Sequence, residues 1–396
     1  MIGPSLGFAS RARRASLPTL PALLGRGDAW LWLAVTALGA LGVVMAYSAS
    51  LEEAPHPAMT AAALRHAALG GLGLAAMLVA ARIDYRLLQR VGAPTYLGAA
   101  ALLLAVVVAG ESEYGARRWL PVGGVTIQPA EAAKLALVIA LASYAVLRPP
   151  RAAALVVTAA LFVLLAGPVL LQPDTGTVVV LAGTWAGVVV AWGAPWRALA
   201  MLVSVVLAAG PLAFALAVPD YQRERLAVFL DPGRDPLGSG FSLRQIEAAL
   251  GSGGLTGNGL FGGAESQLYG VSARSSDFVF ALVGEELGLL GGMAVIALFG
   301  VVAWRGLEAS QRAPDAFGRL LAAGLTALIL TQAVVNVAAN LRLMPATGLP
   351  LPFVSAGGSA LLVMFVAAGL LQSVHAQRLP SRGSGLRASG RWDEEG

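Results

Sequence analysis

The chain has 396 residues, of which 57% are hydrophobic and only 12% charged, and its mean hydropathy is +0.74. Soluble globular proteins carry about 25% charged residues, so composition alone indicates a membrane protein. The chain has no cysteine, which excludes disulfides, thiolate zinc sites and cysteine nucleophiles. His56, His66 and His375 lack the spacing of a metal cluster. The position of the arginines in loops explains the net charge of +5 better than a nucleic-acid-binding function does.

Ten apolar segments are long enough to cross a bilayer, which takes roughly 20 helical residues. They cover residues 29–49, 62–81, 91–110, 130–147, 152–171, 175–193, 198–218, 277–303, 320–341 and 355–376. The predicted fold is therefore an all-α polytopic membrane protein with ten transmembrane helices in a domain of residues 29–376. A polar N-terminal tail, 1–28, and a C-terminal tail, 377–396, flank this domain.

The basic residues predict the orientation, because short cytoplasmic loops are enriched in arginine and lysine. With the N-terminus inside, 17 of the 27 basic residues fall in inner segments and eight in outer ones. Both termini are thus predicted to be cytoplasmic. The large extracytoplasmic loop, 219–276, then joins the seventh and eighth helices, and its length suggests a function. Its run G-S-G-G-L-T-G-N-G-L is predicted to form tight turns rather than an anion nest, and the stretch S-L-R-Q-I-E-A-A-L could lie in the membrane interface.

Three carboxylates occur in or beside the eighth apolar segment, in S-S-D-F-V-F-A-L-V-G-E-E-L-G. Asp277 stands at its outer end, where it could simply cap the helix. Glu285 is eight residues further and so about 12 Å deeper, on a side that lets it border the same cavity, while Glu286 points roughly the opposite way. A charge at that depth costs at least ~2.5–3.5 kcal/mol. Such a glutamate is expected to be functional, or to form an ion pair that locks two helices.

The segment before the fourth helix, G-A-R-R-W-L-P-V-G-G-V-T-I-Q-P-A-E-A-A-K-L, adds charges at the outer face. Pro129 suits the first helical position, and Glu131 and Lys134 follow at i, i+3, a spacing that an ordinary ion pair explains. Lys134 is nevertheless the only lysine beside 26 arginines, which indicates a need for a compact ammonium. Arg117 and Arg118 would either anchor the loop or grip a diphosphate.

Two further polar features lie near the same face. Gln332, Asn336 and Asn340 form a stripe at i, i+4 and i+8 that would bond helices together or line the upper part of the cavity. The run P-A-T-G-L-P-L-P-F-V-S-A-G-G-S predicts non-helical backbone at membrane depth, which is tolerated only where it is buried or wet. Q-P-A-E and Q-P-D-T form a weak local echo. These groups together predict a wet, outward-facing cleft lined by acids.

Five motifs resemble, in their order along the chain, those of the SEDS family (shape, elongation, division and sporulation) of RodA and FtsW, over roughly residues 30–376. They are G-A-R-R-W-L…I-Q-P-A-E-A-A-K-L, Y-Q-R-E-R-L-A-V-F-L-D-P-G-R-D-P-L-G-S-G-F, G-S-G-G-L-T-G-N-G-L, S-D-F-V-F-A-L-V-G-E-E-L-G and P-A-T-G-L-P-L-P-F-V-S-A-G-G-S. The resemblance implies a bacterial cytoplasmic-membrane enzyme that polymerises lipid II into glycan strands. It also implies a class B penicillin-binding protein as partner, with other elongasome or divisome membrane proteins. Y-Q-R-E-R-L leans towards RodA and M-A-Y-S-A-S towards FtsW, so the elongation and division types are not distinguished.

Site residues follow from the same resemblance. The acid before F-[IV]-F, the family's key catalytic residue, matches Asp277, and the acid and lysine of Q-P-x-E-x-x-K match Glu131 and Lys134. A Ser-Ser pair replaces the usual His-Thr before the aspartate, and Ala356 replaces the tyrosine of S-Y-G-G-S. These departures affect the local loop, whereas the carboxylates and the lysine are retained.

An α-linked diphosphate donor and a β-1,4 product imply inversion in a single displacement. Asp277 is then expected to act as general base or to orient the acceptor, and Lys134, positioned by Glu131, to pair with Asp277 or to meet the diphosphate. A Mg²⁺ or Mn²⁺ ion bridging Asp277 and diphosphate is plausible, and no organic cofactor is expected. Expected substrate-binding residues are Arg117, Arg118, Glu285, Asn336 and Asn340. A lipid II flippase is the alternative function, and a scaffold would leave the buried charges unexplained.

Overall fold

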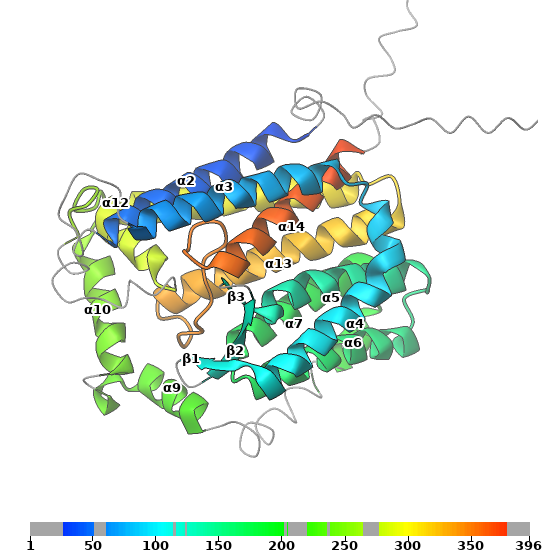
Figure 1. Ribbon diagram of the computed structural model, residues 1–396, viewed down its shortest axis with the longest axis horizontal. Helices are drawn as coiled ribbons and strands as arrows, with labels where there is room; N and C mark the ends of the chain where they lie inside the picture. Colours follow the sequence, from blue (N-terminus) through cyan, green and yellow to red (C-terminus); the bar gives the residue numbers. More distant parts are fainter. Residues whose placement is uncertain are drawn as a thin grey trace, which may run out of the picture.

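The computed structural model describes a helical bundle with a small cap at one end (Figure 1). The residues that it describes are 27–50, 61–113, 116–122, 125–201, 204, 220–235, 238–263 and 277–377. Most of the predicted seventh helix, 198–218, and nearly all of both tails lie outside these residues.

Nine helices in the described part of the chain are long and apolar enough to cross a membrane. They match nine of the ten predicted segments, with the largest differences at helix ends. Their bounds are α2 Ala29–Ser48, α3 Ala61–Arg82, α4 Arg86–Ala109, α5 Pro129–Val146, α6 Ala152–Leu171, α7 Thr175–Trp192, α12 Val279–Gln311, α13 Ala316–Asn340 and α14 Gly358–Ala376.

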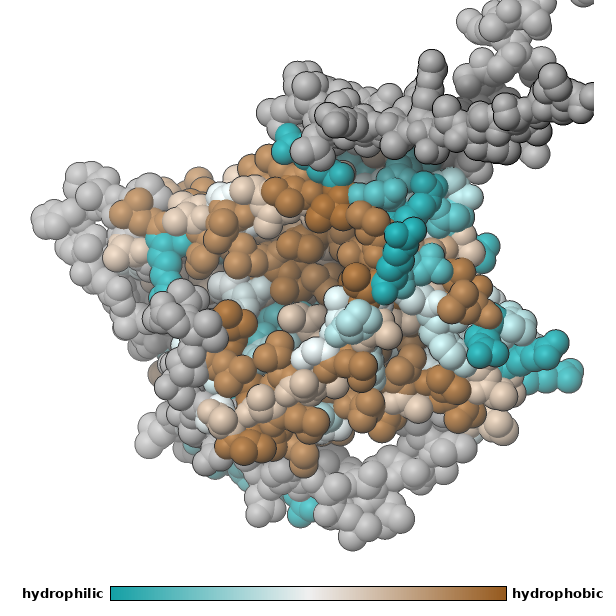
Figure 2. Space-filling model, turned by 45° about the vertical axis from the view of Figure 1, so that its right-hand side comes forward, coloured by the Kyte–Doolittle hydropathy of each residue, from teal (hydrophilic) through white to brown (hydrophobic). Residues whose placement is uncertain are grey.

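Three of these helices form the core. Over an 18-residue apolar window of each helix, 72% of α5, 67% of α13 and 72% of α14 is buried inside the protein, against 28% of α3 and α4. Figure 1 shows α13 and α14 between the pair α2 and α3 and the group α4 to α7. Small residues allow the close packing: a Cβ on Gly183 of α7 would lie 2.4 Å from Oγ1 of Thr331 on α13. Figure 2 shows apolar side chains over most of the visible face, as expected for contact with lipid.

The elements outside the bundle gather at one of its ends (Figure 1). Two of them are helices, α9 Asp220–Leu230 and α10 Ser239–Ser252, joined through the short 3-10 helix η1 Pro232–Arg234. α10 contains the predicted amphipathic stretch. The others are three short antiparallel strands, β1 Glu111–Glu113, β2 Ala116–Val122 and β3 Val125–Ile127, in the order β1-β2-β3. The sequence analysis predicted no strand, so the fold is mainly helical rather than purely so.

The opposite end of the bundle is closed by contacts around Asp28. Its carboxylate accepts a hydrogen bond from the N–H of Leu31 at 2.7 Å and so caps α2, and it forms ion pairs with Arg305 of α12 and His375 of α14. The amide of Gln372 bonds both the N–H and the carbonyl of Asp28, at 2.7 and 2.9 Å. The start of α2 and the end of α14 therefore lie together, away from α9 and α10. That this end faces the cytoplasm stays a prediction.

Candidate functional site

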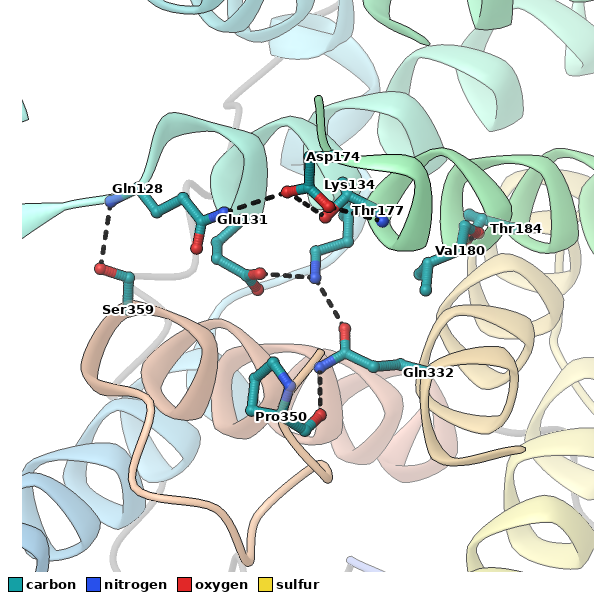
Figure 3. A network of polar contacts seen from close by, with 10 residues as sticks. All are labelled: Gln128, Glu131, Lys134, Asp174, Thr177, Val180, Thr184, Gln332, Pro350 and Ser359. Atoms are coloured by element: carbon teal, nitrogen blue, oxygen red, sulfur yellow. Dashed lines mark hydrogen bonds and ion pairs between the residues drawn. The ribbon is translucent and has the colours of Figure 1, made fainter. Parts of the chain in front are cut away.

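Lys134 lies at the centre of a buried polar network between α5 and α13 (Figure 3). Its Nζ donates to Oε1 of Glu131 at 2.7 Å and to Oε1 of Gln332 at 2.6 Å, and its side chain is 0% exposed. The predicted i, i+3 pair is confirmed, and α5 begins at Pro129 as expected. A buried ammonium is tolerated only when it is paired and hydrogen-bonded, and these two oxygens supply those contacts for Lys134.

Asp174 extends this network and was not predicted as a site residue. It caps α7 by accepting from the N–H and hydroxyl of Thr177, at 3.1 and 2.9 Å, and its Oδ2 accepts from Nε2 of Gln128 at 3.3 Å (Figure 3). The N–H of Gln128 in turn donates to Ser359 at 3.3 Å. The weak echo of Q-P-A-E and Q-P-D-T was the one sequence feature that could have indicated this neighbourhood, because the two motifs start facing helices.

Asp277 lies two residues before α12, at the end of the bundle that carries α9 and α10. Its backbone carbonyl accepts hydrogen bonds from the side-chain amides of Asn336 and Asn340, at 2.8 and 3.0 Å. The residue is half-buried, and a Cβ added to Gly348 would be 3.7 Å from Oδ2 of Asp277. The first turn of α12 is capped from another helix, because Oδ1 of Asn340 accepts from the N–H of Ala281 at 3.0 Å.

The α13 stripe connects Asp277 with Lys134 through backbone carbonyls. Asn336 also donates to the carbonyl of Leu349 at 2.7 Å, and Nε2 of Gln332 donates to the carbonyl of Pro350 at 2.9 Å. The segment that contains these carbonyls is the predicted non-helical run before α14, and it is buried at Leu349, Leu351 and Phe353. Asn336 and Asn340 therefore hold Asp277 and this segment in place, which favours a positioning role over direct substrate contact.

Arg118 adopts the loop-anchoring alternative. Its guanidinium donates to the carbonyls of Gln172 and Pro173, at 3.0 and 2.6 Å, and so ties β2 to the connection between α6 and α7. Arg117 lies in β2 opposite Ser112, but its side chain is outside the part that the structure describes. Contact between these arginines and a diphosphate stays a prediction.

Glu285 and Glu286 of α12 are both fully buried. The carboxylate of Glu286 accepts a hydrogen bond from the hydroxyl of Ser48 at the end of α2. The backbone carbonyl of Glu285 accepts from the N–H of Asn258 at 3.0 Å. The partner of Glu286 is thus a hydroxyl rather than a cation, and a functional role for Glu285 stays a prediction.

The donor atoms around Asp277 bear on the predicted metal ion. Among the described residues, no group of three or more histidines, cysteines or acids is placed to hold a metal. A magnesium ion is commonly held by one or two carboxylates together with substrate phosphates. Asp277 fits such a shared site rather than a cage built from protein alone.

The geometry can support proton transfer at Asp277, which α13 connects to the buried pair of Glu131 and Lys134. Asp277 is half-buried and accessible in part, whereas Glu131 and Lys134 are fully enclosed. A carboxylate is a suitable general base when its position is fixed within reach of the hydroxyl that it deprotonates. Asp277 is therefore a partly accessible acid that is connected to the buried network of Glu131, Lys134 and Gln332.

Comparisons with known proteins agree with this arrangement. The sequence profile of the FtsW/RodA/SpoVE family, described as "Cell cycle protein", matches residues 28–379. The peptidoglycan glycosyltransferase MrdB of Escherichia coli K12 is 38% identical over 310 residues, covering 78% of this chain and 84% of MrdB. A probable peptidoglycan glycosyltransferase FtsW of Geobacter metallireducens is 36% identical, covering 88% and 94% of the two chains.

Solved structures show the same fold. A chain from a study titled "Structural coordination of polymerization and crosslinking by a peptidoglycan synthase complex" superposes with a TM-score of 0.76 at 33% identity, covering 89% of this chain and 98% of that one. The crystal structure of the rod shape determining protein RodA from Thermus thermophilus gives a TM-score of 0.67 at 32% identity, with the same coverage.

Proposed function

The chain belongs to the FtsW/RodA/SpoVE family, and from this premise we propose that it polymerises lipid II at the outer face of the cytoplasmic membrane. It is a peptidoglycan glycosyltransferase of cell elongation or division, and a multi-pass protein of the bacterial inner membrane. The observation that carries the proposal is the half-buried Asp277, whose backbone carbonyl is held by Asn336 and Asn340 and which α13 connects to the buried pair of Glu131 and Lys134.

The reaction that we propose is a single displacement with inversion at the anomeric carbon. Asp277 takes the proton of the acceptor sugar's 4-hydroxyl while that oxygen forms the new glycosidic bond and the diphosphate of the donor departs. A positioned general base contributes typically 10²–10⁴-fold to such a rate. Asn336 and Asn340 support this role because they fix the Asp277 backbone without using its carboxylate.

Lys134 acts at a distance in this proposal. Its ammonium is fully buried and already bound to Glu131 and Gln332, so direct contact with the diphosphate is disfavoured. Its role in this proposal is to hold Glu131 and Gln332 in place. Nε2 of Gln332 also donates to the carbonyl of Pro350, so the network connects Lys134 to the segment before α14. Arg117 stays the candidate for binding the diphosphate.

We also propose that Asp277, together with the substrate diphosphate, would hold a Mg²⁺ or Mn²⁺ ion, which would supply charge neutralisation for the leaving group. Polymerisation should then fall in the presence of EDTA and recover when either ion is added back. Activity that survives complete chelation would contradict this part of the proposal.

A class B penicillin-binding protein is the partner that we propose. The similarity to a chain studied within a peptidoglycan synthase complex supports it. Co-purification of the full chain with such a transpeptidase tests this proposal, and a rate of polymerisation that does not change on adding the transpeptidase would count against it.

Polymerase and flippase activities are separated by an assay without a membrane barrier. Purified protein in detergent is given labelled lipid II, and the products are resolved by length. The proposal predicts glycan strands in detergent micelles, where no leaflet exists to cross. Absence of strands, together with movement of labelled lipid II across the bilayer of reconstituted vesicles, would favour the flippase.

A further inference from the structure

Helix α12 is interrupted in its first third. Gly288 has φ 66° and ψ −164°, which is not helical, so the helix consists of a segment 279–287 and a segment 289–311. A break leaves carbonyls of the first segment and N–H groups of the second without helical partners. In an apolar environment each such group costs several kcal/mol unless something else binds it.

The glycine-rich loop of residues 253–261, which follows α10, supplies those partners. The N–H groups of Asn258 and Gly259 donate to the carbonyls of Glu285 and Glu286, both at 3.0 Å. On the other side of the break, Leu289 and Leu290 donate to loop carbonyls at 2.9 and 3.1 Å. The loop is therefore hydrogen-bonded to both segments of α12 and connects them across the break.

Glycine is required at the closest points of this contact. A Cβ on Gly253 would lie 1.9 Å from the carbonyl oxygen of Gly284, and one on Gly257 would lie 2.1 Å from that of Glu286. A Cβ on Gly288 would lie 2.4 Å from the N–H nitrogen of Gly257. These glycines serve close backbone approach, and the N–H groups of Asn258 and Gly259, which could have contributed to an anion nest, are bound to α12.

Glu286 fixes the docked loop through its side chain. Its buried carboxylate accepts from the hydroxyl of Ser48 and from the backbone N–H of Phe261, the last residue of the loop. The ring of Phe261 meets the ring of Tyr47 edge-on, with centroids 5.4 Å apart. One carboxylate thus joins three elements, namely the end of α2, the loop and the segment 279–287.

We infer that the loop of residues 253–261 is a positioning element of the site, and that Glu286 is the side chain that locks it. The segment 279–287 carries Asp277 at its outer end, where Asn336 and Asn340 hold it, and the docked loop holds its inner end. The docked loop is the working state. This inference rests on the proposed function for the role of Asp277.

The occupied break also argues against a transport gate. In transporters with broken helices, the free half-helix ends bind the substrate or the coupling ion. Here the carbonyls of Glu285 and Glu286 and the N–H groups of Leu289 and Leu290 are all hydrogen-bonded to the loop.

A disulfide tether tests whether the docked state is active, because the chain has no native cysteine. Leu255 and Leu290 are joined by a backbone hydrogen bond and are 69% and 61% exposed. Residues paired in this way have Cα atoms roughly 5–6 Å apart, within the span of a disulfide. Oxidised Leu255→Cys/Leu290→Cys protein should form the bridge and polymerise lipid II within about twofold of its reduced form. A bridge that abolishes activity, restored by reduction, would overturn the inference, as would failure of the two cysteines to bridge.

Two glycines of the loop provide a matched pair of variants. Gly257 and Gly259 have φ of 80° and 90°, but a Cβ on Gly259 meets nothing within 4 Å. Gly257→Ala should lower the bridging rate and kcat at least about tenfold with KM unchanged. Gly259→Ala carries the same positive-φ strain without the clash, so its effect on each should be at least about threefold smaller. Equal effects of the two substitutions would show that docking does not matter.

Glu286 is tested by removal and by conservative replacement. Glu286→Ala should slow bridging and lower kcat at least about tenfold, and Glu286→Gln should restore both to within about threefold, because an amide oxygen still accepts from Ser48 and Phe261. A glutamine variant as impaired as the alanine variant would mean that the charge itself is used, which overturns a positioning role. Disulfide bridging is measured without substrate, so its result does not depend on whether Asp277 is the general base. A failure of the Asp277 assignment can therefore be told apart from a failure of the inference about the loop.

Discussion

Two carboxylates at opposite ends of the bundle, Asp28 and Glu131, are equally buried but differently partnered. Both oxygens of Asp28 are engaged, by Leu31, Arg305 and His375. Glu131 binds Lys134 through Oε1, while its Oε2 has no hydrogen-bond partner among the residues that the structure describes. Such a group is costly in a merely structural setting. The Asp28 cluster also contains such an atom, Nε of Arg305, so the two differ chiefly in what they connect. The Asp28 cluster joins the start of α2 to α12 and α14, whereas the Lys134 network is connected through α13 to Asp277.

Removing the charge of Lys134 should have the largest effect. Lys134→Met leaves Glu131 buried without its cation, and breaking a buried pair in this way costs about 3–5 kcal/mol. Polymerisation should fall at least about 100-fold. The double variant Lys134→Met/Glu131→Gln should regain thermal stability in detergent without regaining activity. Recovery of both would mean that this pair is as structural as the Asp28 cluster.

Asp28→Asn should destabilise the protein without impairing catalysis. Asparagine still caps α2, but the charged hydrogen bond to Arg305 is lost, at a cost of about 1.5–3 kcal/mol. Thermal unfolding in detergent should shift down, while polymerisation per folded molecule stays at the wild-type level. A selective loss of activity would break the comparison by placing Asp28 in the functional machinery.

The contribution of Asp28 should also depend on pH in a defined direction. Burial raises the pKa of Asp28, but hydrogen bonds from Arg305 and Leu31 and the charges of His375 and Arg305 outweigh burial, so its pKa lies below the ordinary 3.8. A depressed folded pKa gives stability that is present above the unfolded pKa and lost as pH falls through the folded one. The melting difference between wild type and Asp28→Asn should persist from pH 7 to 5 and shrink below pH 3.8. A difference that grows in acid would contradict this sign.

The smallest effect is expected at the exposed ion pair between Arg86 and Asp315. Their side chains are 50% and 34% exposed at an N–O distance of 2.9 Å, and pairs of this kind contribute about 0–1 kcal/mol. Asp315 also keeps its hydrogen bond from Tyr85 at 2.7 Å. Arg86→Ala should therefore melt nearly as the wild type does. A melting shift as large as that of Asp28→Asn would show that solvent exposure does not make the Arg86–Asp315 pair less important for stability than the Asp28 cluster.

Local patterns predicted the spans and the nearest charged pair. Apolar runs of about 20 residues gave helix positions, Pro129 marked the start of α5, and Glu131 and Lys134 met because i, i+3 residues share a helix face. The stripe of Asn336 and Asn340 was also visible from its spacing, although its partners were not.

Contacts between distant segments could not be predicted in the same way. Gln332 binds Lys134 from 198 residues away, and Asp174 meets Gln128 across 46 residues, so both depend on how the helices pack. The break at Gly288 was hidden because its hydrogen-bond partners lie in a loop about 30 residues earlier, and an apolar run with glycines reads as one continuous helix. The short strands β1 to β3 were missed because period-2 patterning is weak over three to seven residues.

Polymerisation of lipid II by purified Asp277→Asn protein tests the central claim most directly. Asn336 and Asn340 bind the backbone carbonyl at this position, so the variant should fold and melt as the wild type does. Loss of a general base predicts a fall in glycan synthesis of at least about 100-fold. Synthesis within threefold of the wild type would contradict the assignment of Asp277 as the base.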